Sequence, residues 1–277
     1  MGLASIFVFL FGLAVGSFLN AVIYRLALAE GLVSHVRDRE RKVPASPFRG
    51  RSFCPRCGHT LSWRDLIPVA SFLLLGGKCR YCKARISMQY PLVELATAFI
   101  FLAIFSTKGG SASGGNFEFF TLVYLFTIAS LLIVLFVYDL KHYILPDKIL
   151  FPAIGLAAFW DLLAIRSLGE GWGFVVSGFS AAAFFLAIFL LSRGRAMGFG
   201  DVKLAFFMGL FLGWPNILVA LFLAFCSGAA IGLVLIILKK KGLKSEIPFG
   251  PFLIGGTFGA LFWGKEAVDW YLDLMLV

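Results

Sequence analysis

Two aspartates are the residues best able to perform chemistry in this chain. Asp201 follows Gly198 and Gly200 and precedes Lys203 by two positions, whereas Asp139 ends a long apolar stretch. An aspartic hydrolase needs two carboxylates that share a proton, one acting as base on water and the other as acid toward the scissile carbonyl. The glycines, which lack a Cβ, would let a neighbouring helix or an extended substrate approach closely. The pattern therefore favours a shared catalytic site of Asp139 and Asp201.

Structural roles are the alternative for these polar residues. An aspartate at a helix start is commonly an N-cap, which fits Asp201 and fits Asp147, after Pro146, even better. Lys203 could hold a carboxylate charge or a substrate oxygen, or extend to the membrane surface as an interfacial lysine. Glu94 could pair with basic residues, bind a substrate amine, or favour a helix start through the dipole.

Four cysteines form a second chemical pattern. Cys54 and Cys57 are one C-x2-C pair, and Cys79 and Cys82 are another. Paired cysteines at this spacing bring four sulfurs onto one tetrahedral ion, so we expect a structural Zn²⁺ without an open coordination position. Disulfides are the competing interpretation, disfavoured because these thiols are predicted to lie in the reducing cytosol. Cys226 is expected to be a small buried apolar residue.

The composition is that of a polytopic membrane protein. Of 277 residues, 60% are hydrophobic and 14% charged, and the mean hydropathy is +0.91. A soluble domain needs more polar residues to cover its surface. The net charge of +10 does not indicate nucleic-acid binding, because the basic residues cluster between apolar segments, twelve of them from Arg37 to Arg85. That clustering is typical of the positive-inside rule.

Hydropathy predicts an all-α protein of about eight transmembrane helices with a small cytoplasmic zinc-binding insert. Residues 1–25 form the first helix, 26–89 the insert, and 90–277 a core of about seven helices. The first helix lacks the features of a cleaved signal peptide. The expected spans are 4–24, 91–106, 118–138, 149–166, 173–192, 203–213, 215–238 and 249–264. The span at 203–213 is short, so we expect it to tilt or to thin the bilayer.

Charge and hydropathy agree on the topology. With the N-terminus outside, residues 26–89, 139–148, 193–203 and 239–248 all face the same side, and these are the four basic regions. The nearly charge-free loop at 109–116 falls outside, as do residues 167–172. Asp139 and Asp201 are then both predicted at cytoplasmic ends of membrane helices.

At these residues the chain resembles the type IV prepilin peptidases, also called prepilin leader peptidase/N-methyltransferases, which are bacterial inner-membrane aspartic proteases of the GxGD type. The resemblance covers nearly the whole chain in order. Besides both cysteine pairs and Asp139, it rests on residues 16–20, 24–26, 65–68, 77–78, 90–94, 145–147, 198–204 and 247–251.

The resemblance implies particular roles. Asp139 and Asp201 would be the catalytic aspartates, with Gly198 and Gly200 completing the GxGD signature, and Asp147 would be a recurrent non-catalytic acid. The cysteines would bind zinc in the cytoplasm. The substrates would be prepilins or pseudopilins of type IV pili and type II secretion, cut after a glycine that follows a short basic leader. Many members of the family then methylate the new N-terminus with S-adenosylmethionine; homodimerisation stays open.

Two other functions remain alternatives. A cation-coupled transporter could use the same carboxylates, although transporters usually place them near the bilayer midplane on broken helices. A presenilin or signal-peptide-peptidase type of protease would cut within the hydrophobic helix of its substrate. The cysteine pairs and the run at 247–251 favour the prepilin peptidases over this type.

Overall fold

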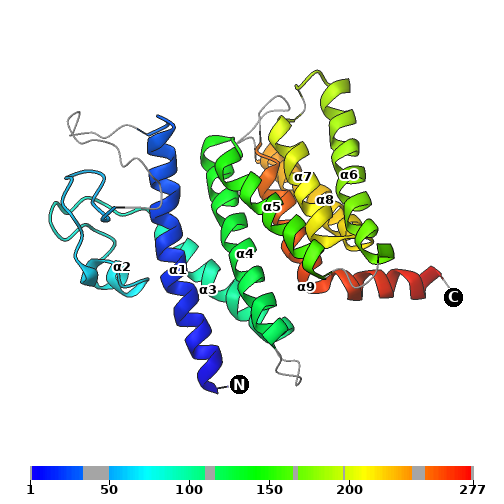
Figure 1. Ribbon diagram of the computed structural model, residues 1–277. Coiled ribbons are helices and arrows are strands. Elements are labelled where there is room, and N and C mark those ends of the chain that lie inside the picture. The colour runs from blue at the N-terminus through cyan, green and yellow to red at the C-terminus, as the bar shows by residue number, and fades with distance from the viewer. Residues whose placement is uncertain are drawn as a thin grey trace. The chain divides into compact units, whose positions relative to one another are not determined.

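The computed structural model describes residues 2–33, 50–109, 116–164, 168–195, 197–238 and 247–275. Part of the predicted basic insert, the polar loop at 110–115 and the basic residues at 239–244 lie outside these ranges. Within them the protein is helical (Figure 1). The only β-type pairings in these ranges are two isolated bridges, Phe53 with Thr60 and Lys78 with Arg85. The predicted all-α class is therefore confirmed for the described residues.

The helices follow the predicted spans closely. The described ranges contain α1 (Gly2–Ala29), η1 (Trp63–Asp65), α2 (Ala70–Leu74), α3 (Gln89–Lys108), α4 (Asn116–His142), α5 (Asp147–Ala164), α6 (Leu168–Leu191), α7 (Phe199–Leu212), α8 (Asn216–Ile237) and α9 (Gly250–Met275). Each of the eight expected spans overlaps one of the α-helices other than α2, and α9 continues to Met275, beyond the expected end at 264. By length and composition five are suited to cross a membrane: α1, α3, α4, α6 and α8.

The chain forms two compact units, Met1–Val134 and Leu135–Val277, and α4 begins in the first and ends in the second. In the first unit α1 packs along α3, where small residues allow close contact. A Cβ on Gly12 would lie 2.6 Å from the Cα of Ala98, so the two helices touch backbone to backbone. The insert between these helices carries η1 and α2.

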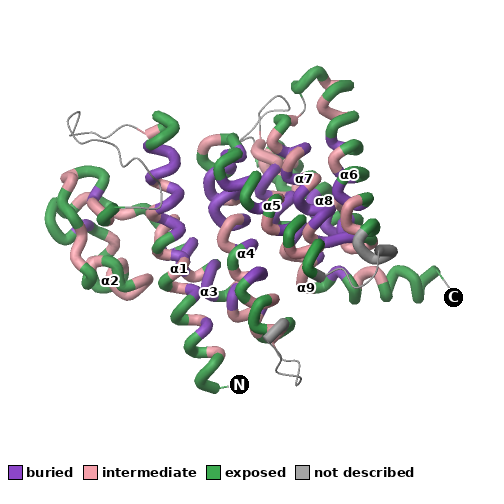
Figure 2. Tube along the Cα trace, viewed as in Figure 1, coloured by how far each residue is buried: buried purple, intermediate pink, exposed green. Residues whose placement is uncertain are grey.

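The second unit is built around α7. This helix packs against α5, α6, α8 and α9, and most of its residues are buried (Figure 2). A Cβ on Gly209 would lie 2.5 Å from the Cα of Gly178, which brings α7 directly onto α6. A short helix that is apolar all round is stable when other helices enclose it. This packing accounts for the short apolar stretch that the sequence led us to expect as a tilted or bilayer-thinning span.

Candidate functional site

The second unit buries both candidate catalytic aspartates. Asp139 lies near the C-terminal end of α4, and Asp201 is the third residue of α7. Their relative exposures are only 5% and 8%, and the two carboxylates are close enough for their charges to interact. Burial of a carboxylate is costly unless a specific contact compensates it, so the neighbours of each group matter.

Gly250, the first residue of α9, packs against Asp139. A Cβ at this position would lie 2.5 Å from Oδ2 of Asp139, so any side chain here would displace the carboxylate. A Cβ on Gly250 would also lie 3.4 Å from Leu145, and one on Gly200 would lie 3.2 Å from the Cβ of Leu145. Leu145 thus packs against glycines from the starts of both α7 and α9.

Backbone amides hold both carboxylates. The N–H of Gly250 donates a hydrogen bond to Asp139, and the N–H of Gly198 donates one to Asp201. Because Gly198 is the N-cap of α7, Asp201 reaches back to its own helix start as the acidic member of a capping box does. The positive end of the helix dipole adds to this stabilisation. Glycine backbone groups therefore orient two carboxylates that carry like charge.

Lys203 binds Asp147, an assignment that the sequence did not make. Its Nζ lies 2.6 and 2.9 Å from the two carboxylate oxygens of Asp147, which begins α5. The same ammonium lies 5.2 Å from the ring centroid of Phe151 and 5.4 Å from that of Phe199. Lys203 thus holds a carboxylate charge, one of the roles expected of it. This pair ties α7 to α5 next to Asp201.

Glu94 lies in the first unit and contacts the insert. Its buried carboxylate accepts a hydrogen bond of 2.7 Å from the backbone N–H of Val69 and another from the Ser17 side chain. The insert therefore meets Glu94 through a backbone amide. Val69 itself has φ +59°, which is unusual for a β-branched residue, and this contact helps to hold it there.

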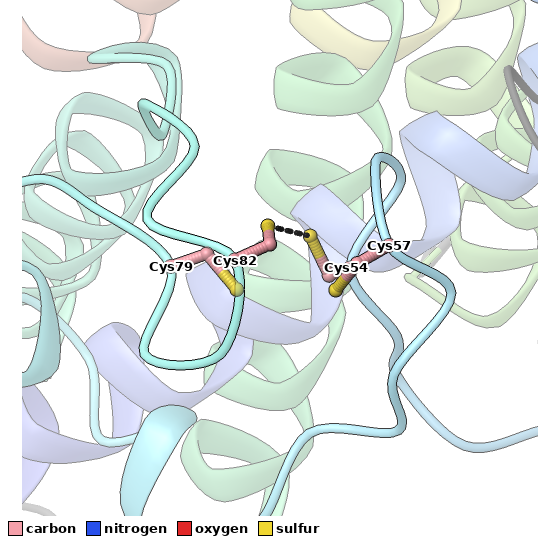
Figure 3. A group of neighbouring side chains, drawn as sticks. All are labelled: Cys54, Cys57, Cys79 and Cys82. Carbon is pink, nitrogen blue, oxygen red and sulfur yellow. Dashed lines mark hydrogen bonds between the residues drawn. The ribbon is translucent and has the colours of Figure 1, made fainter.

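The four predicted metal ligands come together in the insert (Figure 3). The sulfurs of Cys54, Cys57, Cys79 and Cys82 all lie within 4.8 Å of one another, and no disulfide joins them. The sulfurs of Cys54 and Cys82 are 3.9 Å apart. Four thiolates at about 2.3 Å from a tetrahedral ion would stand roughly 3.8 Å apart. The donor set therefore fits a single metal ion.

Each cysteine pair sits in a turn of similar form. In the first knuckle (residues 53–60) the N–H of Gly58 donates to the carbonyl of Cys54, and in the second (residues 78–85) Lys83 donates to Cys79 in the same way. Both Gly58 and Lys83 have positive φ, +70° and +57°. The local backbone thus arranges the two thiol pairs alike.

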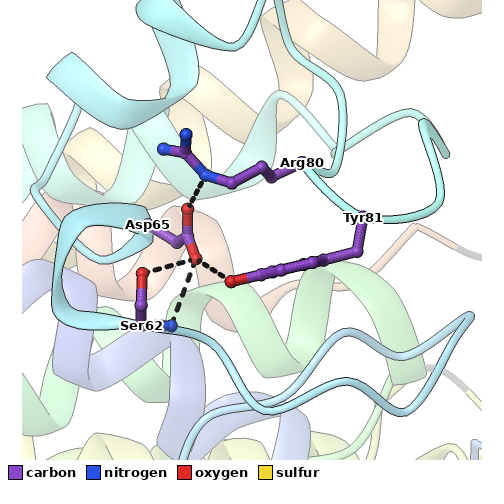
Figure 4. A network of polar contacts seen from close by, with 4 residues as sticks. All are labelled: Ser62, Asp65, Arg80 and Tyr81. Carbon is purple, nitrogen blue, oxygen red and sulfur yellow. Dashed lines mark hydrogen bonds and ion pairs between the residues drawn. The ribbon is translucent and has the colours of Figure 1, made fainter.

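Asp65 braces the insert (Figure 4). Its Oδ1 lies 2.6 Å from Nε of Arg80, and its Oδ2 accepts hydrogen bonds from the hydroxyl and N–H of Ser62 and from the hydroxyl of Tyr81. Burial alone would raise the pKa of this carboxyl, but the donors led by Arg80 outweigh it and hold the pKa at about 2. Asp65 is therefore an ionised structural group that joins η1 to the second knuckle.

Gly250 and Asp65 are two contributors that sequence reasoning did not single out for a role. Both occur in runs that carry the family resemblance, so the signal was present. Their partners lie elsewhere in the chain, however: Gly250 is 111 positions from Asp139, and Asp65 is 15 positions from Arg80. Spacing alone could not pair them.

Helices suited to cross a membrane, two buried aspartates near enough for the charge of one to act on the other, and a separate four-cysteine cluster define the class: a multi-pass membrane protein with the side chains of an aspartic peptidase. The comparisons with known proteins make this specific. Residues 10–107 match the bacterial peptidase A24 N-terminal domain, and residues 125–233 match the type IV leader peptidase family.

Three relatives named prepilin leader peptidase/N-methyltransferase cover nearly the whole chain. The Aeromonas hydrophila protein is 36% identical, over 97% of this chain and 94% of its own length. The Legionella pneumophila protein is 33% identical and the Pseudomonas aeruginosa protein 32%, each over 95% of this chain and 92% of the relative. No solved structure is significantly similar. The chain belongs to the prepilin leader peptidase/N-methyltransferase family.

Proposed function

We propose that this protein is a membrane aspartic endopeptidase that removes the short basic leader from type IV prepilins or pseudopilins, cutting after a glycine. The observation that carries the proposal is that Asp139 and Asp201 are both buried, with Asp139 near enough for its charge to act on Asp201, and that each is oriented by a glycine N–H. The names of the relatives supply the substrate class.

The chemistry follows from two carboxylates sharing one proton. The ionised group takes a proton from water as the water oxygen attacks the peptide carbonyl carbon, and the protonated group donates its proton to the carbonyl oxygen. The resulting gem-diol then collapses: the C–N bond breaks, the amine leaves with a proton from one carboxyl, and the other carboxyl recovers the proton of the diol hydroxyl. Gly250 and Gly198 keep the two carboxyl groups in place throughout.

We place the reaction at the cytoplasmic face of the bacterial inner membrane. The basic residues cluster in the regions that the hydropathy pattern assigns to one side, and the helix ends that carry Asp139 and Asp201 fall on that side. A prepilin with a basic leader and a hydrophobic helix would present its scissile bond at the same boundary. Glycine at this bond would allow an extended approach to the aspartate pair (Asp139 and Asp201).

The second activity we propose is methylation of the new N-terminus with S-adenosylmethionine. The support for it is the N-methyltransferase in the names of the relatives. When bound, this cofactor supplies an electrophilic methyl group to the amine that proteolysis releases. Cleavage necessarily comes first, because the acceptor nitrogen is an amide until the leader is removed, and the released amine must then be deprotonated to accept the methyl group.

We assign Zn²⁺ to the cysteine cluster as a structural ion. Four thiolates are the donor set of closed structural zinc sites, and they leave no position for water or substrate. The ion would join the two knuckles across 25 residues of sequence, from Cys54 to Cys79. Proteolysis should accordingly need no metal at the aspartate pair.

The peptidase proposal is tested with the full chain in lipid nanodiscs and a purified prepilin. Mass spectrometry of the product reports the cleavage site and any added methyl group together. Asp139→Ala and Asp201→Ala should each abolish cleavage, whereas Asp161→Ala should cut at the wild-type rate. Asp161 is a matched control because it is an aspartate in α5 whose Oδ2 is buried without a hydrogen-bond partner among the described residues.

Other outcomes would select the alternatives. Near wild-type cleavage by either variant of the aspartate pair would refute the catalytic assignment. A cut inside the hydrophobic helix of the substrate would indicate a presenilin-type protease. Ion uptake that depends on Asp201, without any peptide cleavage, would indicate a transporter.

Metal analysis tests the zinc assignment separately. We expect about one zinc per chain, lost in Cys54→Ser, because each thiolate supplies one of four coordination positions. Chelators should loosen the insert and make its backbone sensitive to protease, without acting at the aspartate pair. Metal-free protein with four fully reactive thiols would contradict the assignment.

A further inference from the structure

The insert contains an apolar run that neither the aspartate pair nor the metal centre uses. From Leu66 to Leu75 only Ser71 is polar, although the run lies between Arg64 and Lys78 in a strongly basic segment. Ten residues are too few to cross a bilayer, and a run of about this length is typical of a buried core element or of an interfacial segment.

The exposure of its leucines argues against a core element. Leu73 and Leu74, in α2, are 69% and 85% exposed, and Leu66 and Ile67 are 39% and 41% exposed. An exposed apolar patch of this kind marks a surface that another apolar body covers. In a protein with membrane-crossing helices, the bilayer is the apolar surface available to cover these leucines.

The contact between Val69 and Glu94 places the run at the level of that bilayer. Glu94 is the sixth residue of α3, so it lies about 7.5 Å along the helix from Gln89. The 20 residues of α3 extend about 30 Å, which is the thickness of the hydrocarbon core, so almost the whole helix is needed to cross it. Because the N–H of Val69 binds Glu94, α2 starts at the depth of Glu94. That depth is inside the N-terminal end of α3 and therefore at the level of the lipid chains.

The other half of the insert lies farther out along α1. Asn20 donates a hydrogen bond of 3.0 Å to the carbonyl of Tyr90, which fixes the level at which α3 starts. From there α1 continues to Ala29, about 14 Å farther. On this extension Arg25 donates a hydrogen bond of 2.8 Å to the carbonyl of Gly50, just before the first knuckle.

We propose that residues 66–75 form a membrane-interface anchor, in the leaflet where α1 ends and α3 begins. Leu73 and Leu74 insert among the acyl chains, to the shallow depth at which interfacial helices lie. Arg64 and Lys78, which flank the run, meet the phosphates of anionic headgroups. Trp63, 70% exposed with the Arg64 guanidinium 5.3 Å from its ring centroid, lies at the headgroup level, where tryptophan is enriched.

The anchor gives the insert two attachments besides its metal ion. The Glu94 carboxylate holds the start of α2 from the protein side, and lipid holds Leu73 and Leu74 from the other. The metal knuckles are thereby kept at a defined height above the membrane.

A photoreactive benzoylphenylalanine at position 74 of the full chain tests this surface. The protein is placed in nanodiscs of phosphatidylethanolamine and phosphatidylglycerol, irradiated and analysed by mass spectrometry. The control carries the same group at Arg56, an exposed residue of the first knuckle. We expect about tenfold more phospholipid adduct at 74 than at 56, because the anchor places position 74 among the acyl chains and the first knuckle lies farther out along α1.

Equal lipid adducts at the two positions, or a protein adduct at 74 in place of lipid, would overturn the anchor. A protein adduct would mean that a partner or a second copy covers the leucines. As a second measurement, the double variant Leu73→Ser, Leu74→Ser should be cleaved by trypsin at Lys78 in nanodiscs about tenfold faster or more. Removing these leucines from lipid shifts the docking equilibrium by at least that factor, while the metal content should stay at the wild-type level. Unchanged cleavage in that variant would equally refute the proposal.

Discussion

Asp65 and the aspartate pair are buried carboxyl groups in very different surroundings. Asp65 accepts hydrogen bonds from Ser62 and Tyr81 and forms an ion pair with Arg80. Asp139 and Asp201 each accept a backbone hydrogen bond, and the charge of Asp139 acts on Asp201. No basic side chain pairs with either of them within the described ranges. The nearby lysine, Lys203, is held by Asp147.

This difference distinguishes a structural carboxylate from a catalytic pair. A carboxylate surrounded by donors and a cation stays ionised and has no remaining capacity for a substrate. Two carboxylates that interact with each other, and that backbone groups merely orient, can exchange a proton with water and with a peptide. The Lys203–Asp147 pair is part of this arrangement, because a free ammonium beside Asp201 would hold that group ionised.

Gly250→Ala is expected to have the largest effect on activity of the changes that leave both aspartates intact. The new Cβ would lie 2.5 Å from Oδ2 of Asp139 and must push the carboxylate aside. A displacement of about 1 Å in a catalytic group can cost about 100-fold in rate. We expect that loss in kcat for prepilin cleavage, with little change in KM, measured in nanodiscs.

Gly255→Ala is the matched control, since it lies in the same helix and a Cβ there would meet nothing within 4 Å. It should cleave at the wild-type rate. Equal activity of Gly250→Ala and Gly255→Ala would mean that Gly250 does not orient Asp139. The contrast between the aspartate pair and Asp65 would then no longer hold for Asp139.

Asp65→Asn should reverse the pattern, with a clear effect on the insert and a small one on catalysis. The amide keeps the shape of the side chain but loses the ion pair with Arg80. We expect metal to be lost to a chelator up to about tenfold faster, after allowance for the solvent around Arg80. A loss of prepilin cleavage as large as that from Asp139→Ala, with metal retained, would show that the two regions are not distinct.

The same carboxylate predicts a dependence on pH. The pKa of Asp65 is lowered from 3.8 to about 2 in the folded protein. A group with a depressed folded pKa contributes stability that is fully present above its unfolded pKa and is lost as the pH falls through its folded pKa. Protease resistance of the insert should therefore decline between pH 4 and about pH 2 in the wild type. Asp65→Asn should lack that component of the decline.

The cysteine cluster and the helices could be predicted from sequence because their information is local. A C-x2-C pair places two thiols by its own turn, and an apolar run of about 20 residues specifies a membrane helix without any partner. Both cysteine pairs and all eight expected spans accordingly have counterparts in the structure.

Long-range contacts could not be predicted in the same way. Nothing in the sequence assigns Lys203 to Asp147, 56 positions away, in preference to Asp201, two positions away. The contact between Gly250 and Asp139 depends on α9 starting against the end of α4, which helix–helix packing decides. The Val69–Glu94 contact likewise requires a backbone amide in an unusual conformation, for which hydropathy gives no signal.

Lys83→Gly is the smallest of the expected effects and tests whether the two knuckles are equivalent. Lys83 adopts φ +57° where the first knuckle has a glycine, Gly58, at +70°. A left-handed conformation costs a residue with a Cβ about 1 kcal/mol relative to glycine. Lys83→Gly should therefore stabilise the metal-bound insert by about that amount, and Gly58→Ala should destabilise it similarly. Both are measured as the chelator concentration that releases half the metal. Weaker metal retention in Lys83→Gly would contradict this expectation. It would mean that the Lys83 side chain makes a favourable contact that offsets its backbone strain, so that the two knuckles are not equivalent.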